Sequence, residues 1–166
     1  MKKHVRAENT ALTDAQQGLL GKIDFADTYA TTNHVDGMEE ITRSVFDQTP
    51  RWVDQLFAVR NRIAGLLGLE TTVPDDRDER FAVGGYVRTF EILAMSDREI
   101  TLGADESHLN FRALISDDQS DAYNIKVTTL VEYNNLMGRL YMTAIKPFHK
   151  QVVKRMVGNA FAEGAR

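Results

Sequence analysis

The chain has 166 residues, of which 43% are hydrophobic and 27% are charged, a composition that suits one globular domain with its own core. It contains no cysteine, so disulfides, thiol nucleophiles and cysteine-bound metal clusters are excluded, and we expect a cytoplasmic location. The formal net charge of -4 disfavours a general nucleic-acid binder, and no apolar run is long enough to predict a secretory signal or a membrane span.

We expect residues 1–22 to form a weakly structured N-terminal arm, followed by a single α+β domain over residues 23–162. Residues 23–31 show a period of two and predict the first strand of that domain. One side of this strand would carry Ile23, Phe25, Asp27 and Tyr29.

Two helices are predicted next, over Met38–Asp47 and over residues 50–67. Thr49 is the expected cap of the second helix, Pro50 its first residue and Gly68 its end. The apolar stripe of this second helix consists of Val53, Leu56, Phe57, Ile63, Ala64 and Leu67.

Arg60 falls inside that apolar stripe. A buried guanidinium needs a carboxylate or several carbonyl groups as partners. We interpret Arg60 as a satisfied, at least half-buried arginine, and contact with an anionic ligand is the alternative.

Four further segments alternate with a period of two and are separated by short polar turns: residues 86–96, Glu99–Asp105, residues 108–116 and residues 123–133. This pattern is typical of an antiparallel meander with one buried face. The buried sides of the last two segments would carry Leu109, Phe111, Ala113 and Ile115, and Tyr123, Ile125, Val127, Thr129 and Val131.

Residues 136–161 predict a long amphipathic helix with Pro147 in its interior. Because proline removes a backbone donor and clashes with the carbonyl of Thr143, we expect a bend that lets the helix follow the twisted sheet or stand off and leave a cavity. A break into two helices is the alternative. His149 lies on the flank of the apolar stripe, and we interpret it as bonded to a freed carbonyl, with proton transfer or ligand contact as alternatives.

Basic residues are concentrated at the C-terminal end. Residues 136–166 contain six basic residues and one acid, Glu163, so this segment carries +5 and the remainder carries -9. We interpret this as a basic helix that lies on an acidic body. Contact with anionic lipid is the alternative, and the helix lacks the large exposed aromatic side chains that such contact uses.

The order of elements predicts an α+β fold, in which an antiparallel β-meander sheet packs on a long kinked C-terminal helix and two short helices follow the first strand. Three segments resemble the DUF2867 family, a bacterial domain of unknown function: VFDQTPRWVDQLFAVRNRIAGLLGL, GADESHLNFRALI and TTLVEYNNLMGRLYMTAIKPFHKQVVKRMV. This resemblance implies a helix-grip-like fold, similar to START and Bet v 1 proteins. Some members carry the domain behind a reductase-like domain, but this chain has no GxGxxG motif, so no oxidoreductase activity is transferred.

The segment ADESHLNFR would place His108, Asn110 and Arg112 on one strand face. We interpret this row as a solvated face; if it lined the cavity, His108 and Arg112 would fix a polar head group. The histidines are scattered, no H-E-x-x-H spacing occurs and no serine lies in a G-x-S-x-G setting, so we expect no metal, no cofactor and no assigned catalytic residue.

The favoured hypothesis is a module that binds a small apolar molecule between the sheet and the C-terminal helix. Its candidate ligand-binding residues are Trp52, Arg60, Phe90, His108, Phe111, Arg112, Tyr141, Phe148 and His149, although the aromatic ones also suit a plain core. A cavity-free interaction domain, for example a homodimer, is the second hypothesis. A cyclase- or hydrolase-like enzyme that uses the same cavity is the third.

Overall fold

The computed structural model describes residues 4–69 and 76–164, without the side chains of Trp52, Val53, Leu56 and Phe57. Seven antiparallel strands form one open sheet in the order β1-β2-β7-β6-β5-β4-β3. The strands are β1 (Arg6–Glu8), β2 (Phe25–Thr31), β3 (Tyr86–Val87), β4 (Phe90–Met95), β5 (Glu99–Asp105), β6 (Leu109–Asp117) and β7 (Ile125–Tyr133). The helices are α1 (Asp14–Gln17), α2 (Met38–Asp47), α3 (Arg51–Leu66) and α4 (Leu136–Asn159).

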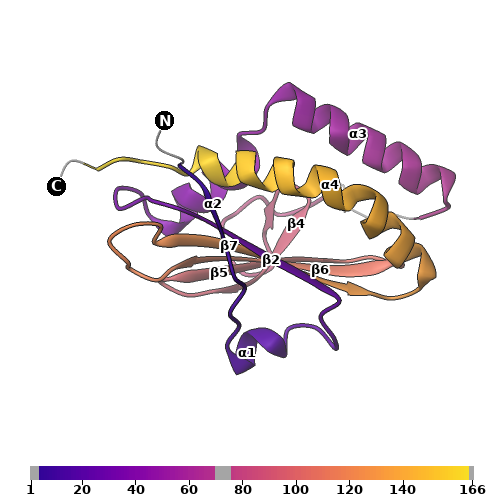
Figure 1. Ribbon diagram of the computed structural model, residues 1–166, viewed down its shortest axis with the longest axis horizontal. Helices are drawn as coiled ribbons and strands as arrows, with labels where there is room; N and C mark the ends of the chain where they lie inside the picture. Colours follow the sequence, from indigo (N-terminus) through magenta and orange to yellow (C-terminus); the bar gives the residue numbers. More distant parts are fainter. Residues whose placement is uncertain (1–3, 70–75, 165–166) are drawn as a thin grey trace.

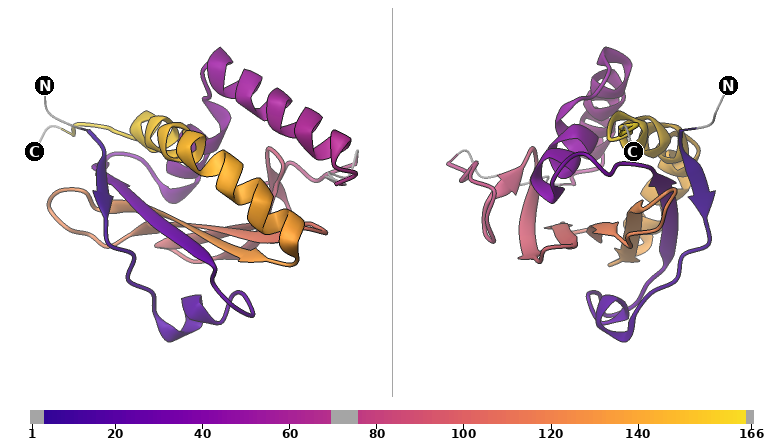
Figure 2. Two further views of the ribbon diagram at one scale, coloured as in Figure 1. Left: turned by 45° about the vertical axis from the view of Figure 1, so that its right-hand side comes forward. Right: turned by 90° about the vertical axis from the view of Figure 1, so that its left-hand side faces the viewer.

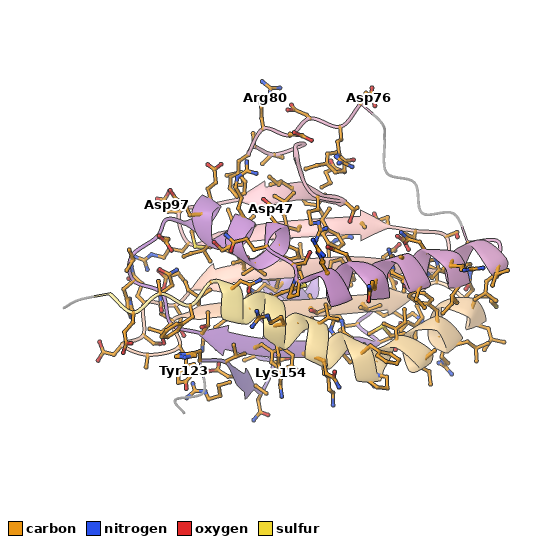
Figure 3. All side chains as sticks on the ribbon, turned by 90° about the horizontal axis from the view of Figure 1, so that it is seen from above. Asp47, Asp76, Arg80, Asp97, Tyr123 and Lys154 are labelled. Carbon is orange, nitrogen blue, oxygen red and sulfur yellow. The ribbon has the colours of Figure 1, made fainter. Side chains whose placement is uncertain are left out.

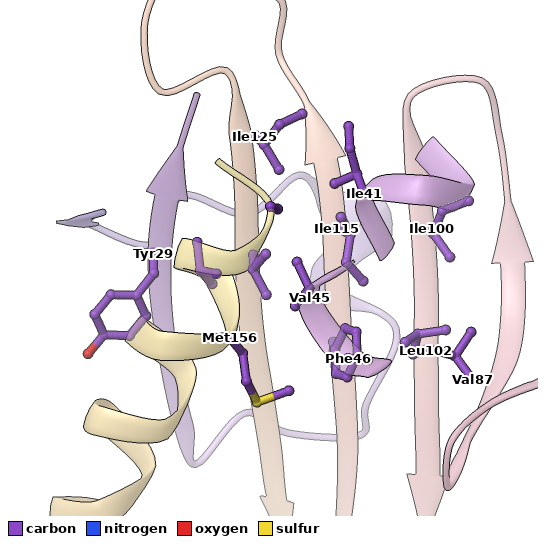
Figure 4. Close-up of a cluster of buried hydrophobic side chains, with 14 of the residues drawn as sticks. Tyr29, Ile41, Val45, Phe46, Val87, Ile100, Leu102, Ile115, Ile125 and Met156 are labelled. Atoms are coloured by element: carbon purple, nitrogen blue, oxygen red, sulfur yellow. The ribbon is translucent and has the colours of Figure 1, made fainter. Parts of the chain in front are cut away.

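The expected α+β fold is therefore confirmed, with α4 packed against the antiparallel sheet and α2 and α3 inserted between β2 and the meander (Figure 1). Within β6 and β7, the side chains that the alternation predicted for the buried side lie on the face of the sheet that α4 covers. Figure 4 shows α2 contributing Val45 and Phe46, and α4 contributing Met156, to the same apolar layer as Leu102 and Ile115. These side chains form the main core.

Residues 12–23 cover part of the outer face of the sheet, and this was not predicted. β1 pairs with β2, and α1 is a single turn capped by Thr13. Figure 2 shows α1 beyond the face of the sheet that is opposite to α4. Three apolar side chains of the arm and the following Ile23 pack against Leu114 and Leu130; the three are Leu12, Leu19 and Leu20. The expectation that Ile23 shares the inner face with Phe25 was wrong, because β2 begins only at Phe25.

Pro147 lies inside α4 without dividing it, so the alternative of two helices was wrong. Asn135 caps the helix by accepting a hydrogen bond from the Gly138 amide at 3.1 Å. Figure 1 shows that α4 changes direction between its two halves, so that its first half descends toward the end of the sheet. The proline thus has the architectural role that the sequence indicated.

The predicted strand over residues 86–96 is in fact a hairpin of β3 and β4. Arg88 occupies the turn with a positive φ of 55°, a conformation that is uncommon for a residue with a side chain. Its guanidinium donates hydrogen bonds to the Thr49 hydroxyl at 2.7 Å and to the Asp54 carboxylate at 3.2 Å, and these bonds hold the turn against α3. Tyr123 has a φ of 57° and likewise lies outside the strand that was predicted to include it.

The start of α3 also differs from the prediction. Pro50 is the N-cap, whereas Thr49 donates its hydroxyl hydrogen to Asp54 and caps no backbone amide. The helix ends at Leu66, and Gly68 follows with a φ of 68°, which confirms it as the terminating residue.

Candidate functional site

An apolar cleft of about 380 Å³ lies between α3, α4 and the inner face of the sheet. Its wall includes Val59 and Ile63 of α3, Phe111 and Val131 of the sheet, and Ile145 and Phe148 of α4. Seen from above in Figure 3, α3 runs beside α4. The volume falls in the range of small-molecule sites, and most of the wall is hydrocarbon.

Three polar side chains of the cleft form a network centred on Arg60. Its Nε donates to the Tyr141 hydroxyl at 2.5 Å, and its Nη2 donates to Glu106 Oε1 at 3.1 Å. Burial lowers the pKa of Arg60, but Tyr141 and Glu106 outweigh this effect, so the pKa is raised and the guanidinium stays charged. Arg60 is therefore the satisfied arginine that the sequence predicted, with a carboxylate as its partner.

Tyr141 keeps its proton in this arrangement. Burial raises the pKa of its phenol and outweighs the opposing influence of Arg60. In the described part of the chain the hydroxyl oxygen accepts from Arg60, and no hydrogen bond from the hydroxyl to an acceptor is formed. The hydroxyl hydrogen of Tyr141 is thus available to a bound molecule.

His108 lies behind this network and does not line the cleft. Its side chain is 0% exposed, its Nε2 is 3.3 Å from Glu106 Oε2, and its ring meets the Tyr141 ring edge to face. Burial lowers the pKa of His108, and the Arg60 charge adds to this effect against the opposing carboxylate of Glu106. Within the described residues neither ring nitrogen has a well-aligned hydrogen-bond partner.

Gly138 explains how His108 becomes buried. The first turn of α4 sits directly on the turn before β6, where a Cβ on Gly138 would collide with the carbonyl oxygen of His108. The same carbonyl accepts from the Asn134 amide at 3.0 Å. Close approach of the backbones at a glycine therefore closes this end of the fold.

A second polar pair bridges β2 and α4. His149 Nε2 lies 3.2 Å from Asp27 Oδ2, and both side chains are largely buried. The prediction that a freed helix carbonyl would be the partner of His149 was wrong, because Asp27 lies on the face of β2 that α4 covers. The His149 ring also packs edge to face against Phe25.

Arg112 belongs to the outer face of the sheet, as does Asn110. Its guanidinium pairs with Asp105 at 2.6 Å, and it contributes to a more polar pocket of about 430 Å³ that adjoins the cleft. The two hollows share Arg60 and Glu106. The predicted common face of His108, Asn110 and Arg112 was wrong for His108, which precedes β6 and turns into the core.

The structure brings six predicted residues together along the cleft: Arg60, Phe90, Phe111, Tyr141, Phe148 and His149. The side chain of Trp52 lies outside the described residues. The sequence analysis did not identify Glu106 as the partner of Arg60 or Asp27 as the partner of His149. Glu106 could have been identified because a buried arginine requires a carboxylate, and Asp27 because it is an acid on an otherwise apolar strand face.

Metal binding has no obvious location in the described part of the chain, where no three His, Asp or Glu side chains cluster. None of the described helices combines the length and the hydropathy that a membrane crossing requires.

Comparison with known families adds one finding. Residues 19–156 match the model of the DUF2867 family, which is described as 'protein of unknown function'. The chain therefore belongs to this family. No curated protein and no solved structure matches the chain.

Proposed function

We propose that this member of the DUF2867 family binds one small, largely apolar molecule in the cleft between α3, α4 and the sheet. The observation that supports the proposal is a hydrocarbon-lined cleft of about 380 Å³ with a polar network of Arg60, Glu106 and Tyr141 on its wall. A helix-grip-like relation to START and Bet v 1 proteins remains part of the proposal, and the pairing of β2 with β7 around two inserted helices supports it.

The polar groups favour a neutral head group. Arg60 and Glu106 already neutralise each other, so an anionic ligand would have to displace a buried carboxylate from its guanidinium. The Tyr141 hydroxyl hydrogen is directed to no acceptor among the described residues. A carbonyl or hydroxyl oxygen at one end of the ligand would accept this hydrogen without disturbing the ion pair.

The proposal is tested by titration with the neutral apolar fluorophore Nile red. Ala144 is exposed on the cleft wall, so Ala144→Trp would fill the cleft without disturbing the core. We expect saturable binding of one dye by the unaltered protein and at least about tenfold weaker binding by Ala144→Trp, since tryptophan occupies ligand volume.

Gln151→Trp is the matched control, because Gln151 is exposed on the same helix and does not line the cleft. It should bind the dye like the unaltered protein. Absence of saturable binding, or equal losses in both variants, would overturn the proposal and favour an interaction domain without a ligand cavity.

Tyr141→Phe tests the head group separately. It keeps the buried ring and removes the hydroxyl, so Nile red, which carries a carbonyl, should bind about threefold to tenfold more weakly, as expected for one lost hydrogen bond. Unchanged affinity would retain the apolar cleft and reject the assigned role of Tyr141.

A further inference from the structure

Exposed large apolar side chains are concentrated on the two helices that flank the cleft. Leu66 is 82% exposed and Leu136 is 68% exposed, which is unusual for leucine next to a folded core. The described residues of this kind on or directly after α3 and on α4 are Val59, Ile63, Leu66, Leu67, Leu136, Leu140 and Phe148. Single exposed leucines need no explanation, but a cluster indicates a contact surface.

The two most exposed members, Leu66 and Leu136, lie at one end of the molecule. Figures 1, 2 and 3 agree that the C-terminal end of α3 and the N-terminal end of α4 lie at the same end. We call the four leucines there the helical tip: Leu66, Leu67, Leu136 and Leu140. Val59, Ile63 and Phe148 continue this apolar surface into the mouth of the cleft.

Basic residues lie beside the helical tip and along α4. α4 contains five basic residues and no acid, although the whole chain has a net charge of -4. Among the described residues none of these five forms an ion pair with an acid; Lys146 and Lys154 instead lie over the rings of Phe25 and Tyr29. The predicted charge complementarity between this helix and the acidic body thus involves no direct ion pair of these five residues among the described residues. Arg62 and Arg139 are exposed next to the tip leucines.

We infer that the helical tip docks on an anionic lipid bilayer. Exposed leucines beside unpaired basic side chains match a surface with an apolar interior and negative head groups. A symmetric pair of copies joined at this tip would bring the two basic helices α4 toward each other, which like-charge repulsion opposes. Docking would place the cleft mouth against the hydrocarbon from which an apolar ligand comes, but the contact itself does not depend on the proposed ligand binding.

The test is flotation of the full chain with vesicles of phosphatidylcholine alone or of phosphatidylcholine mixed with phosphatidylglycerol. We expect binding to the anionic vesicles, weakened by salt. The double substitution Leu66→Gln with Leu140→Gln should lower the partition coefficient at least about tenfold, since two buried leucines are lost from the lipid. These positions are exposed, so folding should be retained, and circular dichroism checks it.

Val35→Gln is the matched control, because Val35 is 61% exposed but lies beside the C-terminal segment, next to Gly164. It should leave vesicle binding unchanged. Substituting Arg62→Gln with Arg139→Gln should weaken binding to anionic vesicles about fivefold for each base removed and leave neutral vesicles unaffected.

Two results would overturn the inference. One is equal flotation of the tip variant and the unaltered chain. The other is absence of vesicle binding together with a concentration-dependent dimer mass that the tip substitutions abolish, which would assign the surface to a second copy of the chain.

Discussion

At the scale of single residues, His108 links the candidate site to pH. Its folded-state pKa is lowered, mainly by burial, so the unfolded chain takes up a proton at a higher pH than the folded chain does. The stability that depends on neutral His108 is therefore complete above the unfolded pKa of about 6.5 and is lost as the pH falls below it toward the lowered folded value. We expect the free energy of unfolding to decrease over this interval.

Urea unfolding as a function of pH measures this effect. His108→Gln should be less stable at neutral pH, because the buried ring is lost. Its stability should nevertheless fall less steeply below about pH 6.5, which is the ordinary pKa of histidine. His34→Gln is the control for the loss of a histidine that is exposed. An unchanged slope in His108→Gln would show that another group carries the pH dependence.

At the scale of elements, we expect the bend of α4 to set the width of the cleft. Pro147→Ala restores a backbone donor for the Thr143 carbonyl and removes a steric clash, so the helix itself gains up to about 3 kcal/mol. A straighter helix would move Phe148 and His149 relative to the sheet. We expect unfolding by urea to show undiminished stability, whereas Nile red affinity decreases.

Gln151→Ala provides the comparison for Pro147→Ala, because it changes an exposed position of α4 without affecting the backbone. It should alter neither stability nor dye binding appreciably. If Pro147→Ala kept full dye affinity, the bend would serve packing alone and would not shape the cleft.

At the scale of the whole molecule, the N-terminal arm completes the sandwich of layers. Leu20 is buried against the outer face of the sheet with Leu114 and Leu130. Leu20→Ala should therefore lower the free energy of unfolding by about 2 kcal/mol, measured by urea unfolding. Ala15→Ser, at an exposed position of α1, is the control and should lower it little.

Removal of residues 1–22 should expose Leu114 and Leu130 and cause self-association, measured by light scattering. A stable monomer without the arm would support the predicted domain boundary at residue 23.

Local spacing in the sequence determined the elements. The alternation in β6 and β7, the bounds of α2 and the proline within α4 were all predictable, because the periods of strands and helices involve only near neighbours in the chain. The same spacing indicated that Arg60 would need a partner. It missed the turn at Arg88, where contacts with α3 override the preference for an extended strand.

Tertiary structure alone decided which groups meet. Arg60 and Glu106 are 46 positions apart in the chain, and His149 and Asp27 are 122 apart. No periodicity within a helix or a strand connects such pairs. They meet because the register of the sheet, and the close contact of the first turn of α4 at Gly138 with the His108 backbone, bring their elements together. The cleft and the exposed helical tip arise likewise from how far α3 stands from the sheet, which depends on packing between layers rather than on the pattern within either helix.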